Sequence, residues 1–315
     1  DYFMAASQVW EDLLASEPAD IDLLYELANV HGWLADTIWL TGDLREARHH
    51  RAEQVNWYRE ALELSPENKK LQGYLLEAKL GLARVAFDTG DTDTALSILV
   101  SARDDTEALT AHDPENTDWL RHAALLELHL ADFHLSLRDL PAAEMALDRA
   151  KELEQTLSDK AAITGRWKTQ ISVQHKLLQA RKADLSENKA EAVHFANQVL
   201  NDLGPFIHQQ DPSFFSLFLR VSAESIQGDL AASPNKDTTH MHGHSRVLEL
   251  VDTNYTQDPK ILAVLSQSLF HLNQTDEARQ LASRLKARGY RPPDFQTFCL
   301  DRLAMGPPSS WQARQ

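Results

Sequence analysis

Cysteine is almost missing from this sequence of 315 residues, which contains a single thiol at Cys299. One cysteine cannot form an internal disulfide bond, and it cannot build a zinc site made of thiolates. A lone thiol does not identify the redox compartment either. The localisation therefore stays open between the cytoplasm and, if a transmembrane helix lies upstream in a longer protein, the periplasm.

Basic residues are also few. The chain has 31 Lys and Arg against 47 Asp and Glu, and its formal net charge is −16 at pH 7. Nucleic-acid binding needs a basic surface, so this balance argues against a nucleic acid as partner. No apolar run approaches the ~20 residues that span a bilayer, so we expect no direct membrane insertion. An acidic surface is compatible with a basic or neutral protein partner.

Glycine and proline are scarce as well, with 11 and 12 residues, which is typical of a folded, helix-rich chain. We find no Gly-rich phosphate loop, no Gly-x-Ser-x-Gly elbow, no His-Glu-x-x-His motif and no kinase signature. We therefore predict that this chain is not an enzyme and needs no cofactor, although a catalytic domain could lie upstream in a longer protein.

What the sequence does contain is a repeat with a period of 48 residues. Shifting the sequence by one period superimposes Pro18, Pro66 and Pro114. Further columns are Leu34/Leu82/Leu130, Ala35/Ala83/Ala131 and Ala47/Ala95/Ala143. Gly42, Gly90 and Arg138 form another column, and an aspartate follows each of these three residues. Self-similarity at a fixed period of this size is typical of a stacked repeat protein.

Each repeat predicts a hairpin of two helices. The positions expected to cap the first helix hold Asp20, Asn68 and Asn116. Gly42 and Gly90 suit a left-handed cap at the end of that helix. We expect Ala35 to face Ala47 where the two helices cross closely, with the same pairing in the next repeats. One hairpin cannot bury both of its apolar faces, so the hairpins must stack.

We therefore predict an all-α fold, an α-solenoid of about six stacked antiparallel helix hairpins. Residues 1–17 are expected to form the second helix of a preceding repeat. The solenoid covers 18–300, with units near 18–65, 66–113, 114–161, 162–210, 211–257 and 258–291. A loop from Gly228 to Gly243 interrupts the fifth hairpin, and 301–315 form a flexible tail.

The alanine columns resemble the tetratricopeptide repeat (TPR), which has a small residue at position 8, an alanine at position 20 and a proline near the end of the unit. The alanine pairs here keep that twelve-residue spacing, but the usual period is 34. The segment DPENTDWL at 113–120 is similar to the unit starts of long-helix TPR arrays that follow a kinase or another signalling domain in large bacterial proteins. The resemblance implies a TPR-like superhelix.

In that family, positions 2, 5, 9 and 12 of the first helix line a concave groove. Carried onto this sequence, the resemblance assigns a partner-binding surface to Asn29, Asp36, Trp39, Glu77, Arg84, Phe87, Asp132 and Leu135. Trp39, Phe87 and Leu135 would form an apolar stripe beside a charged stripe of Asp36, Arg84 and Asp132. Alternatively, the longer helices close the superhelix, and these side chains contact one another.

A second candidate site is the His-x-His-x-His cluster of His240, His242 and His244, in the expected loop of the fifth hairpin. Clustered imidazoles can hold zinc or copper. No carboxylate stands at an obvious ligand spacing, so solvated histidines at the start of a helix are the alternative.

These observations favour a non-catalytic scaffold that binds a protein or peptide partner in its concave groove. The resemblance adds that this scaffold is the sensory or regulatory region of a larger bacterial signalling protein. Two alternatives stay open: a homo-oligomerisation module, for example a homodimer formed through long apolar helix faces, and a metal-responsive sensor that uses the histidine cluster.

Overall fold

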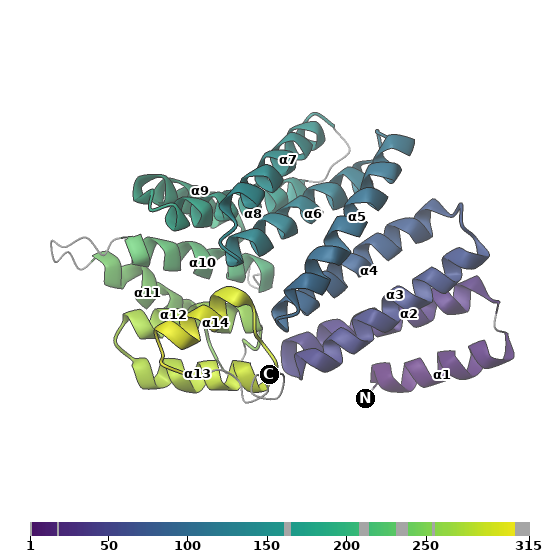
Figure 1. Cartoon of the computed structure of the whole chain (residues 1–315), viewed down its shortest axis with the longest axis horizontal. Coiled ribbons are helices and arrows are strands. Elements are labelled where there is room, and N and C mark those ends of the chain that lie inside the picture. Colours follow the sequence, from purple (N-terminus) through teal and green to yellow (C-terminus); the bar gives the residue numbers. More distant parts are fainter. Residues whose placement is uncertain are drawn as a thin grey trace. The chain divides into compact units, whose positions relative to one another are not determined.

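Helices make up nearly all of the described structure (Figure 1). The computed structural model describes residues 2–17, 19–160, 165–207, 214–230, 239–253 and 256–305, and within these ranges it contains fourteen helices and no strand. The helices are α1 Tyr2–Ser16, α2 Ile21–Thr41, α3 Leu44–Leu64, α4 Lys69–Asp88, α5 Thr92–His112, α6 Thr117–Ser136, α7 Leu140–Ser158, α8 Gly165–Leu185, α9 Lys189–Ile207, α10 Phe214–Leu230, α11 Thr239–Leu250, α12 Pro259–His271, α13 Thr275–Ala287 and α14 Pro293–Asp301. The predicted all-α solenoid of helix hairpins is confirmed.

The first helix of each early hairpin begins at a side-chain cap, as predicted. Asp20 Oδ1 accepts hydrogen bonds from the backbone N–H groups of Asp22 at 2.8 Å and Leu23 at 3.1 Å. Asn68 and Asn116 accept the equivalent pairs of bonds at 3.1–3.3 Å. Each cap satisfies N–H groups that the helix itself leaves without partners, which stabilises the helix by about 1 kcal/mol.

The turns between paired helices follow the prediction at Gly90 and depart from it at Gly42. Gly90 has a φ of 87°, and the next N–H, of Asp91, donates to the carbonyl of Ala86 at 2.9 Å, as in a left-handed helix cap. Arg138 takes the same conformation one repeat later, with a φ of 62°. Gly42 instead has a φ of −115°, so the predicted left-handed cap is wrong there. Its N–H still donates to the carbonyl of Ile38 at 2.7 Å, which ends α2 without a left-handed residue.

Packing divides the chain into two units, which we describe separately. The first unit is Asp1–Phe133 with Asp148–Lys168, and the second is His134–Leu147 with Thr169–Gln315. In the first unit the hairpin of α2 and α3 packs against α4. The buried cluster that joins these three helices consists of Leu24, Ala28, Val55, Tyr58, Ala61, Leu71 and Ala78. Stacking therefore buries the apolar stripe that each helix carries, as a repeat array requires.

The second unit has its own core. A buried cluster from α8, α9 and α10 consists of Val173, Leu177, Ala180, Ala183, Ala192, Ala196, Val199, Leu203, Leu219, Ala223 and Ile226. Alanine supplies a large share of this list, so the backbones of these helices approach closely. The hairpins α10/α11 and α12/α13 then pack against each other.

Small residues occupy the crossing points of the hairpins. The six alanines of the two repeated columns are each 1% exposed or less: Ala35, Ala47, Ala83, Ala95, Ala131 and Ala143. In the hairpin of α12 and α13, Ser266 and Ala278 keep the same spacing, and the Ser266 hydroxyl donates to the Ala278 carbonyl at 2.9 Å. In this hairpin the residues at the two positions therefore meet.

The predicted loop of the fifth hairpin is shorter than expected. We expected a loop from Gly228 to Gly243, but α10 continues through Gly228 to Leu230, and α11 already begins at Thr239. The rest of that loop, 231–238, lies outside the described residues. The prediction failed because the glycines suggested a turn, whereas they serve here as points of close contact between two helices.

Helix α14 was not predicted, because Pro292 and Pro293 indicated only an end to the preceding helix. Pro293 instead opens a new helix, a position where its missing N–H costs nothing. α14 buries Phe295, Phe298 and Cys299. Of the predicted flexible tail at 301–315, the part 306–315 lies outside the described residues, and Leu303 in the remainder is only 1% exposed. None of the described helices combines the length and the apolarity needed to cross a bilayer.

We predict that Ala95→Leu lowers the free energy of unfolding by roughly 1–3 kcal/mol, because the larger side chain overpacks the crossing of α4 and α5. Ala108→Leu, an exposed position on the same helix, is the matched control and should change it by less than about 0.5 kcal/mol. Urea denaturation followed by circular dichroism measures both. Equal stability of the two variants would contradict the close crossing.

Candidate functional site

The apolar part of the expected partner-binding surface is buried. Trp39 on α2 is 7% exposed, Phe87 on α4 is 3% exposed, and Leu135 on α6 is 1% exposed. Phe87 stacks on Phe133 with ring centroids 3.8 Å apart and an angle of 6° between the rings. All three side chains are buried, so they form no apolar stripe on the surface.

Trp39 is fixed by polar contacts as well as by packing. Its indole Nε1–H donates to the carboxylate of Asp88 at 2.9 Å, and both side chains are buried. The guanidinium of Arg84 lies over the Trp39 ring, 5.1 Å from its centroid, in a cation–π contact. The Trp39 ring therefore helps to hold the Arg84 guanidinium in place.

The polar residues of the expected surface remain accessible. The carboxylate of Asp36 pairs with Arg51, lies 3.6 Å from Arg84 Nη2, and has a side chain that is 56% exposed. Glu77 on α4 is exposed. We call Asp36, Glu77 and Arg84 the charged face.

Arg51, which the sequence analysis did not single out, is a buried side chain that contacts Asp36 of the charged face. Its side chain is only 10% exposed, and its guanidinium also donates to Gln54 Oε1 at 2.7 Å. Burial lowers the pKa of Arg51, while the charge of Asp36 acts in the opposite direction. Gly81 makes room for it, because a Cβ atom at Gly81 would lie 3.0 Å from Arg51 Nε. Gly81 was a sequence signal for a close contact at this point of α4. Arg51 itself stands on α3, outside the helices that the family pattern assigns to binding.

The remaining expected residues take different places. Asn29 on α2 accepts a hydrogen bond from the Tyr58 hydroxyl at 2.8 Å, so it helps to hold α2 against α3. Asp132 on α6 is half-buried. The structure thus brings Asp36 and Arg84 together, and it assigns packing contacts to Asn29, Trp39 and Phe87.

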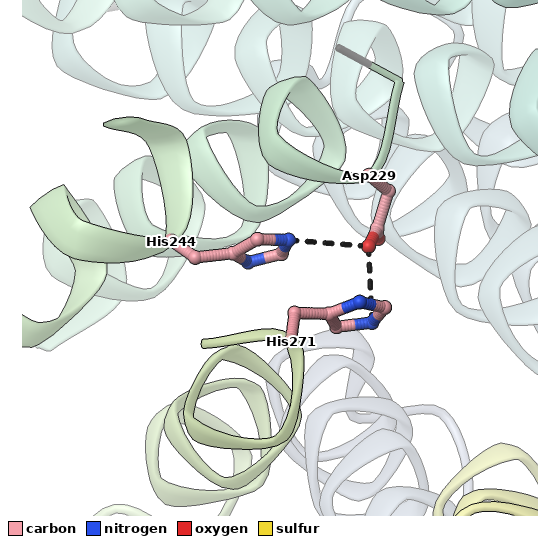
Figure 2. Close-up of side chains that lie close together, drawn as sticks. All are labelled: Asp229, His244 and His271. Atoms are coloured by element: carbon pink, nitrogen blue, oxygen red, sulfur yellow. Dashed lines mark ion pairs between the residues drawn. The ribbon is translucent and has the colours of Figure 1, made fainter. Parts of the chain in front are cut away.

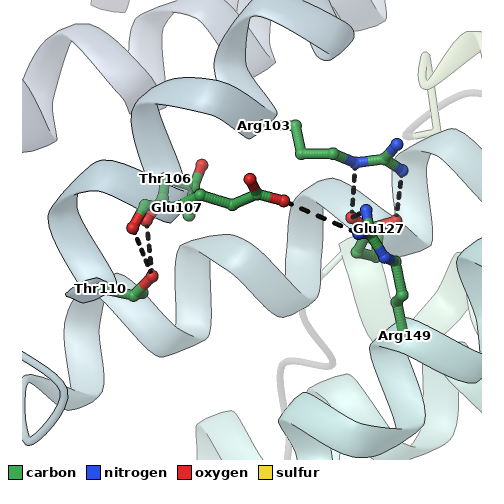
Figure 3. Close-up of polar contacts among 6 residues, drawn as sticks. All are labelled: Arg103, Thr106, Glu107, Thr110, Glu127 and Arg149. Atoms are coloured by element: carbon green, nitrogen blue, oxygen red, sulfur yellow. Dashed lines mark hydrogen bonds and ion pairs between the residues drawn. The ribbon is translucent and has the colours of Figure 1, made fainter.

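A pocket of about 290 Å³ lies between α5, α6 and α7 in the first unit. Figure 3 shows the polar contacts among six residues that line it. At its wall, Arg103 makes a two-pronged contact with Glu127, at 2.8 Å from Nε and 2.7 Å from Nη2. Arg149 lies 3.7 Å from both Glu127 and Glu107. The Glu127 side chain is only 5% exposed, so two arginines balance one buried carboxylate. The charge of the Glu127 carboxylate is therefore neutralised by side chains of the chain itself.

Glu127 also belongs to a column of polar residues that repeats with the period of the array. One and two periods earlier, the equivalent positions are Lys79 and His31, and we call these three residues the polar column. Lys79 pairs with Asp105 on α5, and His31 Nδ1 lies 3.0 Å from His50 Nδ1 on α3. Each of these three hairpins therefore has a polar contact at the same place but with different chemistry.

The three histidines of the sequence cluster do not share one environment. All three fall in α11, where His242 is exposed and His244 is 1% exposed. The side chain of His240 lies outside the described part of the structure. Residues two apart on a helix point in different directions, so α11 separates the His242 and His244 side chains.

His244 instead meets Asp229 of α10 and His271 of α12 (Figure 2). Asp229 Oδ1 lies 3.3 Å from His244 Nε2 and 3.1 Å from His271 Nε2. The two imidazole rings are parallel, with an angle of 3° and centroids 4.6 Å apart. We call these three residues the Asp-His-His cluster. Nearby, burial and the negative charge of Asp229 raise the pKa of Asp184 on α8.

The single thiol lies apart from these groups, in α14. Cys299 is 2% exposed, and burial raises the pKa of its thiol to about 11. The thiol therefore stays protonated at neutral pH.

Stacked helix hairpins that repeat with a fixed period define an α-solenoid. Residues 76–100 match the family model described as "Tetratricopeptide repeat". A tetratricopeptide repeat protein from Parabacteroides merdae has a similar crystal structure, with a TM-score of 0.51 and 15% identity over 96% of this chain and 91% of that one. The chain accordingly resembles tetratricopeptide-repeat arrays in its fold, and one segment of it matches that repeat in sequence.

Yeast Tom70 is a further structural match, with a TM-score of 0.47 and 13% identity over 99% of this chain and 59% of Tom70. A comparison with curated proteins finds no match.

We predict that Trp39→Phe destabilises the array by roughly 1–3 kcal/mol, because it removes the indole donor from the buried carboxylate of Asp88. Trp33→Phe on the same helix is the matched control, since Trp33 is 51% exposed and should tolerate the change. Thermal melting of the two variants makes the comparison. A control variant that melts below Trp39→Phe would contradict the structural role of the buried contact.

A pH prediction follows from His122 on α6, which is 6% exposed. Burial, and then the charge of Arg121, lower its pKa from 6.5 to about 4. The unfolded chain therefore takes up the proton first, so this contribution to stability is present at pH 7 and is lost as the pH falls through 6.5 towards 4. We expect a loss of roughly 2 kcal/mol between about pH 7 and about pH 5.

The free energy of unfolding against pH, from urea denaturation, tests this contribution. His122→Gln should lose less stability than the wild type over that range, while His194→Gln, at an exposed position of α9, should follow the wild type. Identical pH profiles for all three proteins would refute the assignment.

Proposed function

We propose that this chain is the sensory or regulatory region of a larger bacterial signalling protein and that it binds a segment of a partner protein across the first helices of its hairpins. Repeat arrays place equivalent helices side by side, which suits them to bind extended segments. The observation that carries the proposal is the charged face of Asp36, Glu77 and Arg84, which stays accessible while its apolar neighbours are buried.

The charged face is held in position before any partner arrives. Arg51 and Arg84 both lie within ion-pair distance of the Asp36 carboxylate, and the Trp39 ring contacts the Arg84 guanidinium. Side chains that are already ordered lose little conformational entropy on binding, so their interactions contribute more to affinity. The ordered side chains favour the interpretation of the charged face as a recognition site over its interpretation as a solvated surface.

Charge indicates the chemistry of the partner. The face offers two exposed carboxylates, Asp36 and Glu77, against one guanidinium, and the whole chain carries a net charge of −16. Complementary charge steers a partner and fixes its register. A basic segment whose Lys or Arg side chains reach Asp36 and Glu77, with an acidic group near Arg84, fits this face.

The signalling assignment has a separate basis. The long repeat period and the unit start at 113–120 resemble arrays that follow signalling domains in large bacterial proteins. In such a protein, binding of a partner to this region would regulate a catalytic or DNA-binding domain on the same chain.

Selection from a random peptide library on the immobilised chain tests the binding proposal. We expect enrichment of peptides rich in Lys and Arg. Glu77→Lys should weaken these peptides by roughly 1–2 kcal/mol, because it places like charges against each other, and it should leave the melting temperature unchanged because Glu77 is exposed.

Glu60→Lys makes the same charge change at an exposed position of α3, outside the charged face. If both variants lose affinity equally, the effect is one of net charge. Peptides that bind Glu77→Lys as well as wild type, or a selection that enriches acidic peptides, would refute this site.

A further inference from the structure

The Asp-His-His cluster joins three helices of the second unit at one point (Figure 2). Asp229 stands near the end of α10, His244 in α11, and His271 at the last position of α12. We propose that these three side chains form a binding site for a divalent transition metal of the zinc class. Of the two histidines in the sequence cluster whose side chains are described, His242 and His244, only His244 belongs to it.

The distances fit metal coordination. Zinc binds imidazole nitrogen and carboxylate oxygen at about 2.0–2.2 Å, so two ligand atoms in a tetrahedral site lie about 3.4 Å apart. Asp229 Oδ1 is 3.3 Å from His244 Nε2 and 3.1 Å from His271 Nε2, and all three ligand atoms lie within 4.8 Å of one another. A small adjustment of the two imidazoles would bring all three atoms to coordination distance.

Two buried polar atoms point into the cluster without a hydrogen bond. His244 Nε2 and Asp229 Oδ1 approach closely, yet their geometry makes no hydrogen bond, and neither atom has another hydrogen-bonding partner among the described residues. A buried polar atom left without a partner costs about 1–3 kcal/mol. Coordination of one cation would satisfy both atoms.

Ser268 on α12 orients His244 for this role. Its hydroxyl oxygen lies 3.2 Å from His244 Nδ1, and both residues are 1% exposed or less. With Nδ1–H donating to Ser268 Oγ, the lone pair remains on Nε2, the atom that faces Asp229. Metal-bound histidines generally hold their second nitrogen in this way.

Two glycines make the approach possible. A Cβ atom at Gly228 would lie 2.7 Å from the His244 ring, and one at Gly243 would lie 2.4 Å from the carbonyl oxygen of Glu224. Any larger residue at either position would push α11 away from α10. The glycines that suggested a loop in the sequence therefore bring His244 to Asp229.

The donor set and its surroundings indicate which metal. Two imidazoles and one carboxylate suit zinc and its neighbours in the first transition series, whereas calcium and magnesium prefer sites made of oxygen. The negative end of the α12 dipole lies at His271 and favours a cation there. The side chains of Asp229 and His271 are 35% and 41% exposed, which leaves a route from solvent and room for water ligands.

Isothermal titration of zinc chloride into the chain without a histidine tag tests the site. We expect one ion per chain and a rise in melting temperature with zinc, because the ion joins α10, α11 and α12. Asp229→Asn and His271→Ala should each weaken zinc binding at least tenfold, and Ser268→Ala should weaken it by about 10–100-fold.

His242→Ala is the matched control, because His242 lies on the same helix as His244 but is exposed, and its affinity should equal that of wild type. Circular dichroism in a chelator should show that Asp229→Asn and His271→Ala remain folded. If the wild type binds no zinc, or if zinc binding survives His271→Ala and is lost in His242→Ala, the proposed site is wrong.

Discussion

Close crossing of paired helices is the constraint on which the rest of this structure depends. Two helices joined by a short turn can approach most closely only where small side chains occupy the point at which they cross. The repeated alanine columns meet this condition in the early hairpins, Ser266 and Ala278 meet it near the end of the chain, and Gly228 and Gly243 meet it most tightly. Once the hairpins form, stacking is the only way to bury their remaining apolar faces.

Much of the fold could be predicted because the residues that define a hairpin recur in each repeat of the sequence. A proline, a capping residue and a pair of alanines each occur three times, and together they indicate where a hairpin begins and where its two helices cross. Features that occur once gave weaker signals. Pro293 could equally end one helix or open another, and Gly228 could equally mark a turn or a close contact. Only the neighbouring helices decide between these meanings.

The candidate sites were harder to predict because burial depends on neighbouring elements. Spacing placed Trp39 and Phe87 at equivalent positions of two helices, but it could not show that Asp88 and Phe133 would contact them. The local histidine pattern identified His244 and missed both of its partners, since Asp229 and His271 come from other helices. Sequence patterns within one helix report which residues share a face, and contacts between helices depend on the packed fold.

The polar column has a consequence for how the chain avoids misassembly. Proteins built from similar repeats risk pairing a helix with the wrong copy of its neighbour, either within one molecule or between two. Here His31 meets a histidine, Lys79 meets an aspartate, and Glu127 meets two arginines. A first helix paired with the wrong second helix would place Lys79 or Glu127 against a group that cannot neutralise its charge, which costs several kcal/mol for a buried group. The polar column thus gives each of these first helices a preferred partner within its own hairpin.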